Sequence, residues 1–190
     1  MKKNFMIALW FTLVTTVMFG ILYPLAVTGL AQVLFPQKAN GQLIEKNGKV
    51  VGSRIIGQSF TEPGYFHSRP SNAGTGYDAT ASSGSQLGPT NKNLLDRVKG
   101  DVEKLQVENP KAPIPVDLVT SSGSGLDPEI SLAAGKFQIP RVARERTMKE
   151  EDVRALVQKH TKGRDMGFLG EPRVNVLELN LDLDSVHPLR

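Results

Sequence analysis

The sequence predicts an α+β protein: a single N-terminal transmembrane helix, residues 1–36, followed by a small mixed α/β domain, residues 37–190, that is extracytoplasmic. Three observations predict this organisation. The 190 residues leave room for one ordinary domain with an appendage. A run of 34 residues from Asn4 to Gln37 contains no charged side chain, although 22% of the chain is charged. Beyond that run, stretches of helical periodicity mix with short alternating stretches.

The uncharged run is long enough to cross a bilayer. At 1.5 Å per residue it would form a helix of roughly 50 Å, against a hydrocarbon core of about 30 Å. Its apolar centre extends from Phe5 to Leu30. A cleaved signal peptide is the alternative, since Gly29-Leu30-Ala31 offers small residues for cleavage, but signal cores usually have only about 7–15 residues. We therefore expect a retained anchor.

The charges that flank the span bear on its orientation. Lys2 and Lys3 lie directly before it, whereas Lys38 and three further basic residues follow it within the next 20 positions. A bare count does not favour either side. Because a long following domain translocates largely regardless of its charge, we expect the N-terminus in the cytoplasm and the domain outside.

Small residues recur at every fourth position of the span, which places them on one helix face. Such a face lets another helix approach closely, so we expect the span to dock against other membrane helices. Chance alignment of residues that are common in membrane helices is the alternative. We also expect a kink at the proline of this face, because proline removes a backbone hydrogen bond. The positions are Ala8, Thr12, Thr16, Gly20, Pro24 and Thr28.

After the span, the first half of the domain shows a hairpin, a long loop and a helix. Asn47-Gly48 between two short arms in residues 43–51 predicts a β-hairpin. Residues 60–89 are rich in Gly, Ser and Pro and poor in aliphatic side chains, so they predict a long loop pinned by its aromatic residues. An apolar stripe over residues 91–107 predicts a helix that ends at Asn109-Pro110.

The second half predicts a strand, two helices and a final strand. Residues 115–120 read as a short strand, and a helix is expected to begin at Pro128 and to be interrupted at Pro140. Residues 147–150 have the pattern of a capping box before a third helix, which Gly163 would close. The alternating apolar residues of 173–183 predict a strand with a β-bulge.

Two loops share the pattern S-S-G-S-x-L-x-P, at residues 82–89 and 121–128, and both are expected to precede helices. Free backbone N–H groups in such a loop could bind an anion such as a phosphate. The alternative is that these residues only cap helices and form turns. The residues of the candidate anion or nucleotide loop are Ser121, Ser122, Gly123, Ser124 and Gly125.

Several function classes lack the residues they require. The chain has no cysteine, which excludes disulfides, thiolate metal sites and a cysteine nucleophile. Without Lys2 and Lys3 the formal charge falls from +4 to +2, too small for a nucleic-acid-binding field. The sequence has no P-loop and no G-x-S-x-G motif, and its three histidines do not have metal-ligand spacing. We therefore predict no catalytic residue and no metal site.

A series of motifs in order resembles one family closely: the small C subunit of the Kdp-type potassium-transporting ATPase of bacteria and archaea. The resemblance covers nearly the whole chain. The matching pieces are Tyr23-Pro24, residues 56–60, 64–71, 83–87, 116–120, 124–127, 138–143, 170–175 and 179–181.

The resemblance implies a non-catalytic accessory subunit of a high-affinity potassium importer in the cell (inner) membrane. Its implied partners are a channel-like A subunit, a P-type ATPase B subunit, a very small F subunit and the lipid bilayer, but no nucleic acid. Tyr65, His67, Arg69 and Asp127 lie on polar loops that would contact the A subunit. The family is also described as raising ATP affinity through its serine-glycine loop. A domain outside the membrane cannot touch cytosolic ATP, so we favour stabilisation or gating of the potassium entrance over direct nucleotide contact.

Overall fold

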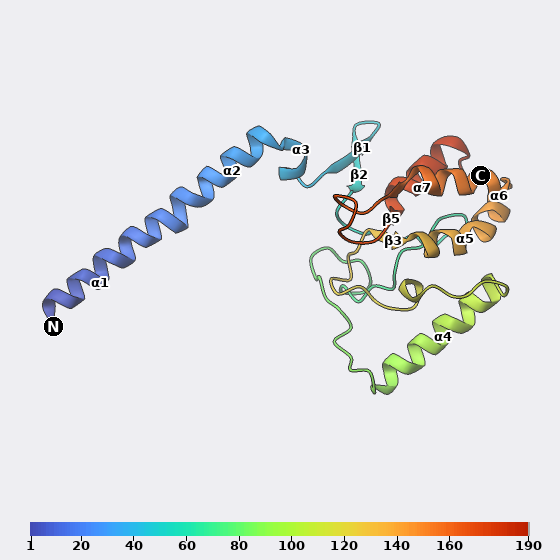
Figure 1. Ribbon diagram of the computed structural model, residues 1–190, viewed down its shortest axis with the longest axis horizontal. Coiled ribbons are helices and arrows are strands. Elements are labelled where there is room, and N and C mark those ends of the chain that lie inside the picture. The colour runs from blue at the N-terminus through green and yellow to red at the C-terminus, as the bar shows by residue number, and fades with distance from the viewer. Residues whose placement is uncertain (190) are drawn as a thin grey trace. The chain divides into compact units, whose positions relative to one another are not determined.

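The computed structural model describes residues 1–189, and the chain divides into two compact units between Val50 and Val51 (Figure 1). The first unit is mainly one helical stretch, Lys2–Leu34, of 33 residues. Its length and composition suffice for one membrane span, as predicted, and no side chain in it is buried. Its parts are α1 (Lys2–Thr15), the π-helical segment η1 (Thr16–Leu22) and α2 (Tyr23–Leu34), and the short α3 (Pro36–Ala39) follows.

The helix runs on through Pro24 instead of breaking there. The seven π-helical residues of η1 lie immediately before the proline, and α2 begins at Tyr23. Wider π turns are one of the ways in which a helix adjusts to the backbone bond that a proline lacks. The sequence predicted a kink at Pro24; the structure shows a change of helix type directly before it, and the kink stays a prediction.

The predicted hairpin is confirmed. Strands β1 (Leu43–Lys46) and β2 (Lys49–Ser53) form a two-stranded sheet at the boundary of the two units. Asn47 and Gly48 both have positive φ, 54° and 72°, as a type I′ turn requires. The long loop is confirmed as well, because the structure has no helix or strand between Ser53 and Lys92.

The second unit is built on a small antiparallel sheet with strand order β3-β5-β4. Ile130 and Thr161 both lie opposite Val174, which makes β5 the central strand. The strands are β3 (Glu129–Ser131), β4 (Thr161–Lys162) and β5 (Arg173–Asn175). The helices are α4 (Lys92–Glu108), the 3₁₀ helix η2 (Val116–Leu118), α5 (Leu132–Glu145), α6 (Glu150–Lys159) and α7 (Val176–Val186).

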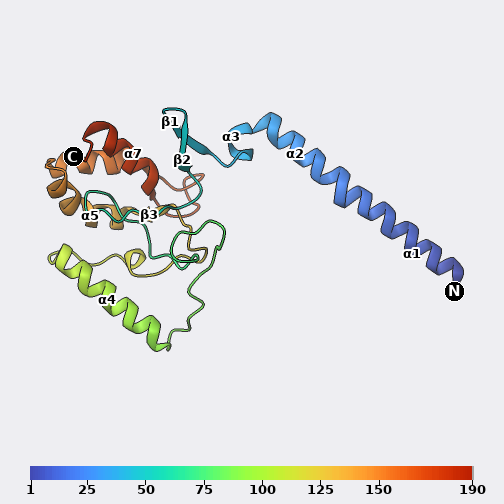
Figure 2. The ribbon, with the colours of Figure 1, turned by 180° about the vertical axis from the view of Figure 1, so that it is seen from behind.

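The hydrophobic core of this unit lies among α5, α6, α7 and the sheet. Helix α5 packs on α6, and α6 packs on α7. In both views α4 lies apart from these helices, and none of its residues is fully buried (Figure 1 and Figure 2). The largest fully buried apolar side chains are Phe66, Ile130, Ile139, Leu179, Leu183, Val142, Val153, Val157, Val174 and Val176.

Two of the expected elements in the middle of the unit are wrong. Residues 115–120 do not form a strand: the Leu118 N–H bonds to the Pro115 carbonyl and closes the 3₁₀ helix η2. The second helix does not begin at Pro128, because β3 intervenes and pairs with β5. Helix α5 begins after Ser131, whose side chain accepts the Ala134 N–H at 3.0 Å and caps it.

Helix α5 is not interrupted at Pro140, which lies inside it. Proline cannot donate to the carbonyl four residues earlier, and its ring crowds the neighbouring turn. The side chain of Asn109 donates to the Phe137 carbonyl, three residues before the proline, at 3.0 Å. A side chain from outside the helix thus gives a further hydrogen bond to a carbonyl in the turn before the proline.

The capping box predicted at residues 147–150 is absent, because Thr147, which would be its first residue, forms the C-terminal cap of α5 instead. Thr147 has φ of 54°, its N–H bonds to Arg144, and the Met148 N–H bonds to Ala143. These bonds form a Schellman motif with threonine at the position that usually holds glycine. Helix α6 therefore begins after Lys149 without a side-chain cap, and it ends at Lys159 rather than at Gly163.

The final strand predicted for residues 173–183 is also wrong in most of its length. Only Arg173–Asn175 are extended, and Val176 begins α7. The Asn175 side chain accepts the Glu178 N–H at 3.0 Å and so caps the helix. The apparent β-bulge in the sequence is the point at which strand gives way to helix.

Candidate functional site

Two buried amide side chains hold the backbone of residues 63–67, which we call the clamped segment. Asn180 of α7 accepts the Phe66 N–H and donates to the Phe66 carbonyl, both at 2.9 Å. Gln138 of α5 binds His67 in the same way, at 2.8 Å to its N–H and 3.1 Å to its carbonyl. Each amide supplies the two bonds that a neighbouring β-strand would give, so an irregular loop can pass through the core with its polar groups paired.

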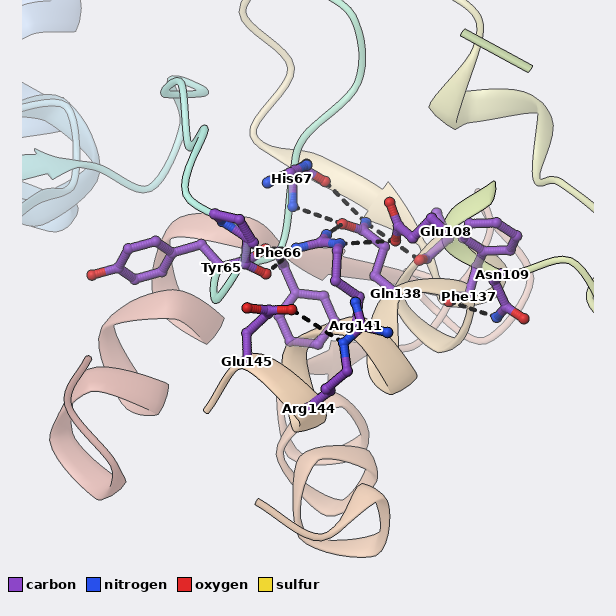
Figure 3. Close-up of polar contacts among 12 residues, drawn as sticks. Tyr65, Phe66, His67, Glu108, Asn109, Phe137, Gln138, Arg141, Arg144 and Glu145 are labelled. Atoms are coloured by element: carbon purple, nitrogen blue, oxygen red, sulfur yellow. Dashed lines mark hydrogen bonds and ion pairs between the residues drawn. The ribbon is translucent and has the colours of Figure 1, made fainter. Parts of the chain in front are cut away.

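Two arginines complete the clamp, and Figure 3 shows the Gln138 and Arg141 side chains reaching the backbone of His67 and Tyr65. Arg141 Nη1 donates to the carbonyls of Pro63 and Tyr65, the latter at 2.9 Å. Arg146 Nε donates to the Gly64 carbonyl at 2.6 Å. Three consecutive carbonyls, residues 63 to 65, are therefore bound by guanidinium groups.

Carboxylates balance both buried arginines and connect the clamp to other helices. Glu108 of α4 pairs with Arg141, with Oε1 and Nε 2.9 Å apart. Asp184 of α7 pairs with Arg146 at 2.9 Å and also accepts the Tyr65 hydroxyl at 2.9 Å. Because a buried charge is tolerated only when it is paired, these contacts fix α4, α5 and α7 around the clamped segment.

The electrostatics of the clamp favour the neutral forms of the His67 and Tyr65 side chains. Burial lowers the pKa of the His67 imidazole, and the positive charge of Arg141 lowers it further. Burial and the hydrogen bond to Asp184 raise the pKa of the Tyr65 hydroxyl. Neither group has a neighbouring nucleophile to activate, so the arrangement is suited to binding a loop rather than to acid–base chemistry.

A second cluster joins the two predicted polar loops. Arg69 Nη1 pairs with Asp127 at 3.0 Å, and Nη2 donates to the Ser121 carbonyl at 3.4 Å. The Tyr77 hydroxyl donates to the Arg69 carbonyl from the other side. The structure thus brings Arg69 and Asp127 together, and 26% and 29% of their side-chain surfaces stay exposed.

The two S-S-G-S loops lie directly against each other. The Ser83 N–H donates to the Ser124 carbonyl at 2.9 Å. A Cβ atom on Gly84 would lie 2.9 Å from the Gly123 oxygen, and one on Gly125 would lie 2.6 Å from the Ser83 oxygen. The glycines of the repeated pattern are therefore required by the close approach of one loop to the other.

Some of the polar groups of the candidate anion loop form hydrogen bonds within the loop itself. Ser122 and Gly125 are buried, whereas Gly123 and Ser124 are exposed. The Gly125 N–H bonds to Ser122, and the Ser124 hydroxyl accepts the Leu126 N–H at 3.1 Å. Contact of Ser121–Gly125 with a nucleotide stays a prediction. The second copy of the pattern precedes strand β3 and not a helix, contrary to expectation.

The small-residue face of the span crosses the π segment. Thr16 and Gly20 lie within η1, Thr12 lies before it and Thr28 lies after it. In an α-helix, residues four apart overshoot a full turn by roughly 40°, so the face winds slowly around the helix on either side of η1.

Some of these residues are predicted from the sequence and others are not. The predicted residues Tyr65, His67, Arg69 and Asp127 all lie in the two clusters, although the sequence suggested a surface role for them rather than a place in a clamp. The side chains that bind the loop were not predicted: Gln138, Arg141, Arg146, Asn180 and Asp184. Their signal was the presence of polar side chains inside otherwise apolar helical stretches, where a polar group needs a partner. Among residues 1–189 no group of three or more His, Asp and Glu is arranged to hold a metal ion.

Comparison with known proteins gives consistent matches over the whole chain. The model of the family described as "K+-transporting ATPase, c chain" (KdpC) matches residues 5–185. The chain is 62% identical over 189 residues to the potassium-transporting ATPase KdpC subunit of Koribacter versatilis, covering 100% of this chain and 98% of that protein. It is 56% identical to the protein of the same description from Rhodopseudomonas palustris (strain BisB5), covering 97% and 98%. The corresponding Caulobacter vibrioides protein is 57% identical, with coverage of 91% and 88%.

Proposed function

The chain belongs to the KdpC family, the c chain of the K+-transporting ATPase, and on that premise we propose that it is a membrane-anchored assembly subunit. It is an accessory subunit of the complex and not the catalytic one. Its span docks among the helices of the complex, with the N-terminus in the cytoplasm. Its domain lies on the outer side of the cell membrane and stabilises or gates the potassium entrance.

The observation that carries this proposal is the unpartnered helix Lys2–Leu34. It is long enough to span a bilayer, and none of its side chains is buried against the rest of its own unit. Gly20 meets only the Thr16 methyl group, at 3.8 Å from an added Cβ, so the helix surface there is shallow. A small-residue face of this kind is suited to close contact with a neighbouring helix.

The organisation of the second unit supports a binding role for it. Burial lowers the pKa of the histidine and raises the pKa of the tyrosine in the clamped segment, and the arginines and carboxylates around them are paired. These contacts hold the clamped segment in place, since each carbonyl from Pro63 to His67 has a side-chain donor, and they fix the start of the loop that leads to the partly exposed Arg69. Rigid loops on a folded scaffold are typical of binding surfaces. We propose that the exposed edges of Arg69 and Asp127 contact the channel-like A subunit.

The remaining partners follow from the same proposal. The B subunit would hydrolyse ATP, and the small F subunit would complete the membrane part of the complex. The alternative function, nucleotide contact through Ser121–Gly125, is disfavoured by two considerations. A domain on the outer side cannot reach cytosolic ATP, and the glycines of the two loops are already explained by their mutual packing.

The docking face is tested by enlarging it. Thr16→Leu with Gly20→Leu should reduce co-purification of the chain with the transport complex, because leucine prevents the close approach of helices. Thr15→Leu with Gly29→Leu is a matched control of the same residue types outside the face, and an added Cβ at Gly29 meets nothing within 4 Å. Undiminished co-purification and potassium transport of the first variant would contradict the docking face.

Thiol labelling tests the orientation of the span. Because the chain has no native cysteine, an introduced cysteine is its only thiol. A Ser185→Cys variant places a thiol at an exposed position of the second unit. In intact cells an impermeant maleimide should label it, whereas Asn4→Cys at the other end of the span should be labelled only after permeabilisation. The reverse pattern would place the domain in the cytoplasm and favour the nucleotide alternative.

A further inference from the structure

The loop between β4 and β5 presents three large apolar side chains to solvent. Met166, Phe168 and Leu169 are 85%, 69% and 50% exposed, and we call them the apolar tip. The potassium-transport role proposed above does not use them. Contiguous exposed apolar residues mark a surface that contacts a membrane or another protein.

The shape of the loop holds these side chains outward. The Asp165 N–H bonds to the Leu169 carbonyl at 2.8 Å, and the Leu169 N–H bonds back to Asp165 at 2.9 Å. Between them, Met166 and Gly167 both have positive φ, 53° and 83°, and form a tight turn. The apolar tip is therefore an ordered hairpin end and is not produced by an irregular, unpaired chain.

The charged residues at the base of the loop are all paired. Arg164 binds both carboxylate oxygens of Glu171 at 2.8 Å. Asp165 pairs with Arg173 at 2.8 Å and with Lys162 at 3.3 Å. Arg173 also pairs with Glu129 at 2.7 Å. Three cations meet three carboxylates, so the base of the loop carries no net charge and offers no unpaired ion to a charged partner.

The loop adjoins the part of the second unit that receives the chain from the span. It leads into β5, whose last residue, Asn175, donates to the Arg54 carbonyl at 2.8 Å. Arg54 also pairs with Glu178 at 2.8 Å. Only residues 35–50 connect the span with this unit, and α3 and the hairpin shorten that connection. The place where the chain enters this unit thus lies beside β5, the strand that follows the loop.

We propose that the apolar tip inserts into the headgroup and acyl boundary of the outer leaflet, as a second contact of the chain with lipid. This inference rests on the proposed anchoring of the span and outer position of the domain. Met, Phe and Leu side chains need no hydrogen-bond partner there, and burial of such side chains drives interfacial binding. We favour lipid over a protein surface as the partner. In a protein interface, polar groups around the apolar centre form hydrogen bonds with the partner. Here the charged groups around the apolar tip are paired with one another instead.

The test is depth-dependent quenching in the complete transport complex reconstituted in nanodiscs. Phe168→Cys and Met166→Cys variants carry an environment-sensitive fluorophore, and Val107→Cys on α4, at a position that is 84% exposed, is the control. Spin-labelled lipid should quench the fluorophore at positions 166 and 168, which should also emit at shorter wavelength. Aqueous iodide should quench it at position 107 only.

Three results would overturn the inference. Iodide quenching at 166 and 168 equal to that at 107 would show that the tip is in water. Protection of both positions from iodide and from spin-labelled lipid would show that a protein covers the tip. Loss of the chain from the nanodiscs would contradict the proposed membrane anchor, on which this inference rests. A chain that is retained, with a tip that spin-labelled lipid does not quench, would contradict the insertion of the tip alone. Potassium transport of each labelled complex confirms that it is folded.

Discussion

Arg146 and Asp184 form an ion pair, with Nη2 and Oδ1 2.9 Å apart, although none of the Arg146 side-chain surface is exposed. The other guanidinium donors bind the carbonyls of Gly64 and His187 at 2.6 and 2.7 Å. The Tyr65 ring lies against the same group, 4.7 Å from ring centre to Cζ. One buried cation therefore ties the end of α5 to α7, to the C-terminal segment and to the clamped segment.

Removing this cation should strongly destabilise the second unit. Arg146→Met keeps most of the side-chain length but leaves Asp184 and two carbonyls without their donor, so we expect a loss of about 3–5 kcal/mol in the free energy of unfolding. Arg144→Met is the control, because the Arg144 side chain is 67% exposed, and a change within about 0.5 kcal/mol is expected there. Urea unfolding of the full chain in detergent, followed by circular dichroism, measures both. Equal effects would show that the buried ion pair has no special role.

Asn180 should be as important for the clamped segment as Arg146 is for the unit. Asn180→Leu has nearly the same volume but leaves the Phe66 N–H and carbonyl unpaired in the core, at a cost of at least about 2 kcal/mol. Hydrogen exchange at the Phe66 amide reports the effect directly and should become faster. Asn93→Leu on the exposed surface of α4 is the control and should leave that amide protected. A protected Phe66 amide in the Asn180 variant would contradict the clamp.

The elements that could be predicted from sequence are those with a local cause. The hairpin at Asn47-Gly48 follows from its turn residues, and α4 follows from its apolar stripe, with Asn91 as cap. The membrane span needs only length and composition. None of these depends on a contact with a distant part of the chain, which is why local patterns predict them.

The elements that were mispredicted depend on distant contacts. Residues 129–131 are extended because they pair with 173–175, a contact across more than 40 positions. In α7 the buried face includes Asn180, which is only 1% exposed because it binds Phe66. A polar residue on the core face interrupts the helical pattern of apolar residues. The remaining pattern alternates like that of a strand, with leucine at 177, 179, 181 and 183. The clamp was missed for the same reason, since its partners lie far apart in sequence.

The carboxylate of Asp182 should stabilise the fold at neutral pH and lose this effect in acid. Hydrogen bonds from Lys159 and His160 lower the pKa of its carboxyl group from the ordinary 3.8 to about 2. Because the folded pKa lies below the unfolded one, the stabilisation is complete above pH 3.8 and is lost as the pH falls towards 2. Lys159 is largely exposed, so solvent screening limits the effect to roughly 1 kcal/mol. Melting temperatures of the wild type and Asp182→Asn should differ by a constant amount above pH 5 and converge near pH 2. A difference that persists at pH 2 would assign the effect to something other than this carboxylate.

Substitution by alanine should destabilise the fold at one glycine of this loop and be neutral at another. Gly125 has φ of +69°, and an added Cβ would lie 2.6 Å from both the Ala73 nitrogen and the Ser83 oxygen, so Gly125→Ala should cost more than about 2 kcal/mol of unfolding free energy. At Gly123 an added Cβ meets nothing within 4 Å, and Gly123→Ala should change stability by less than about 0.5 kcal/mol. If the loop only packs against its counterpart, Gly123→Ala should also leave the ATP dependence of the complete transporter unchanged. A raised KM for ATP in Gly123→Ala at unchanged stability would instead support nucleotide contact through the exposed part of the loop.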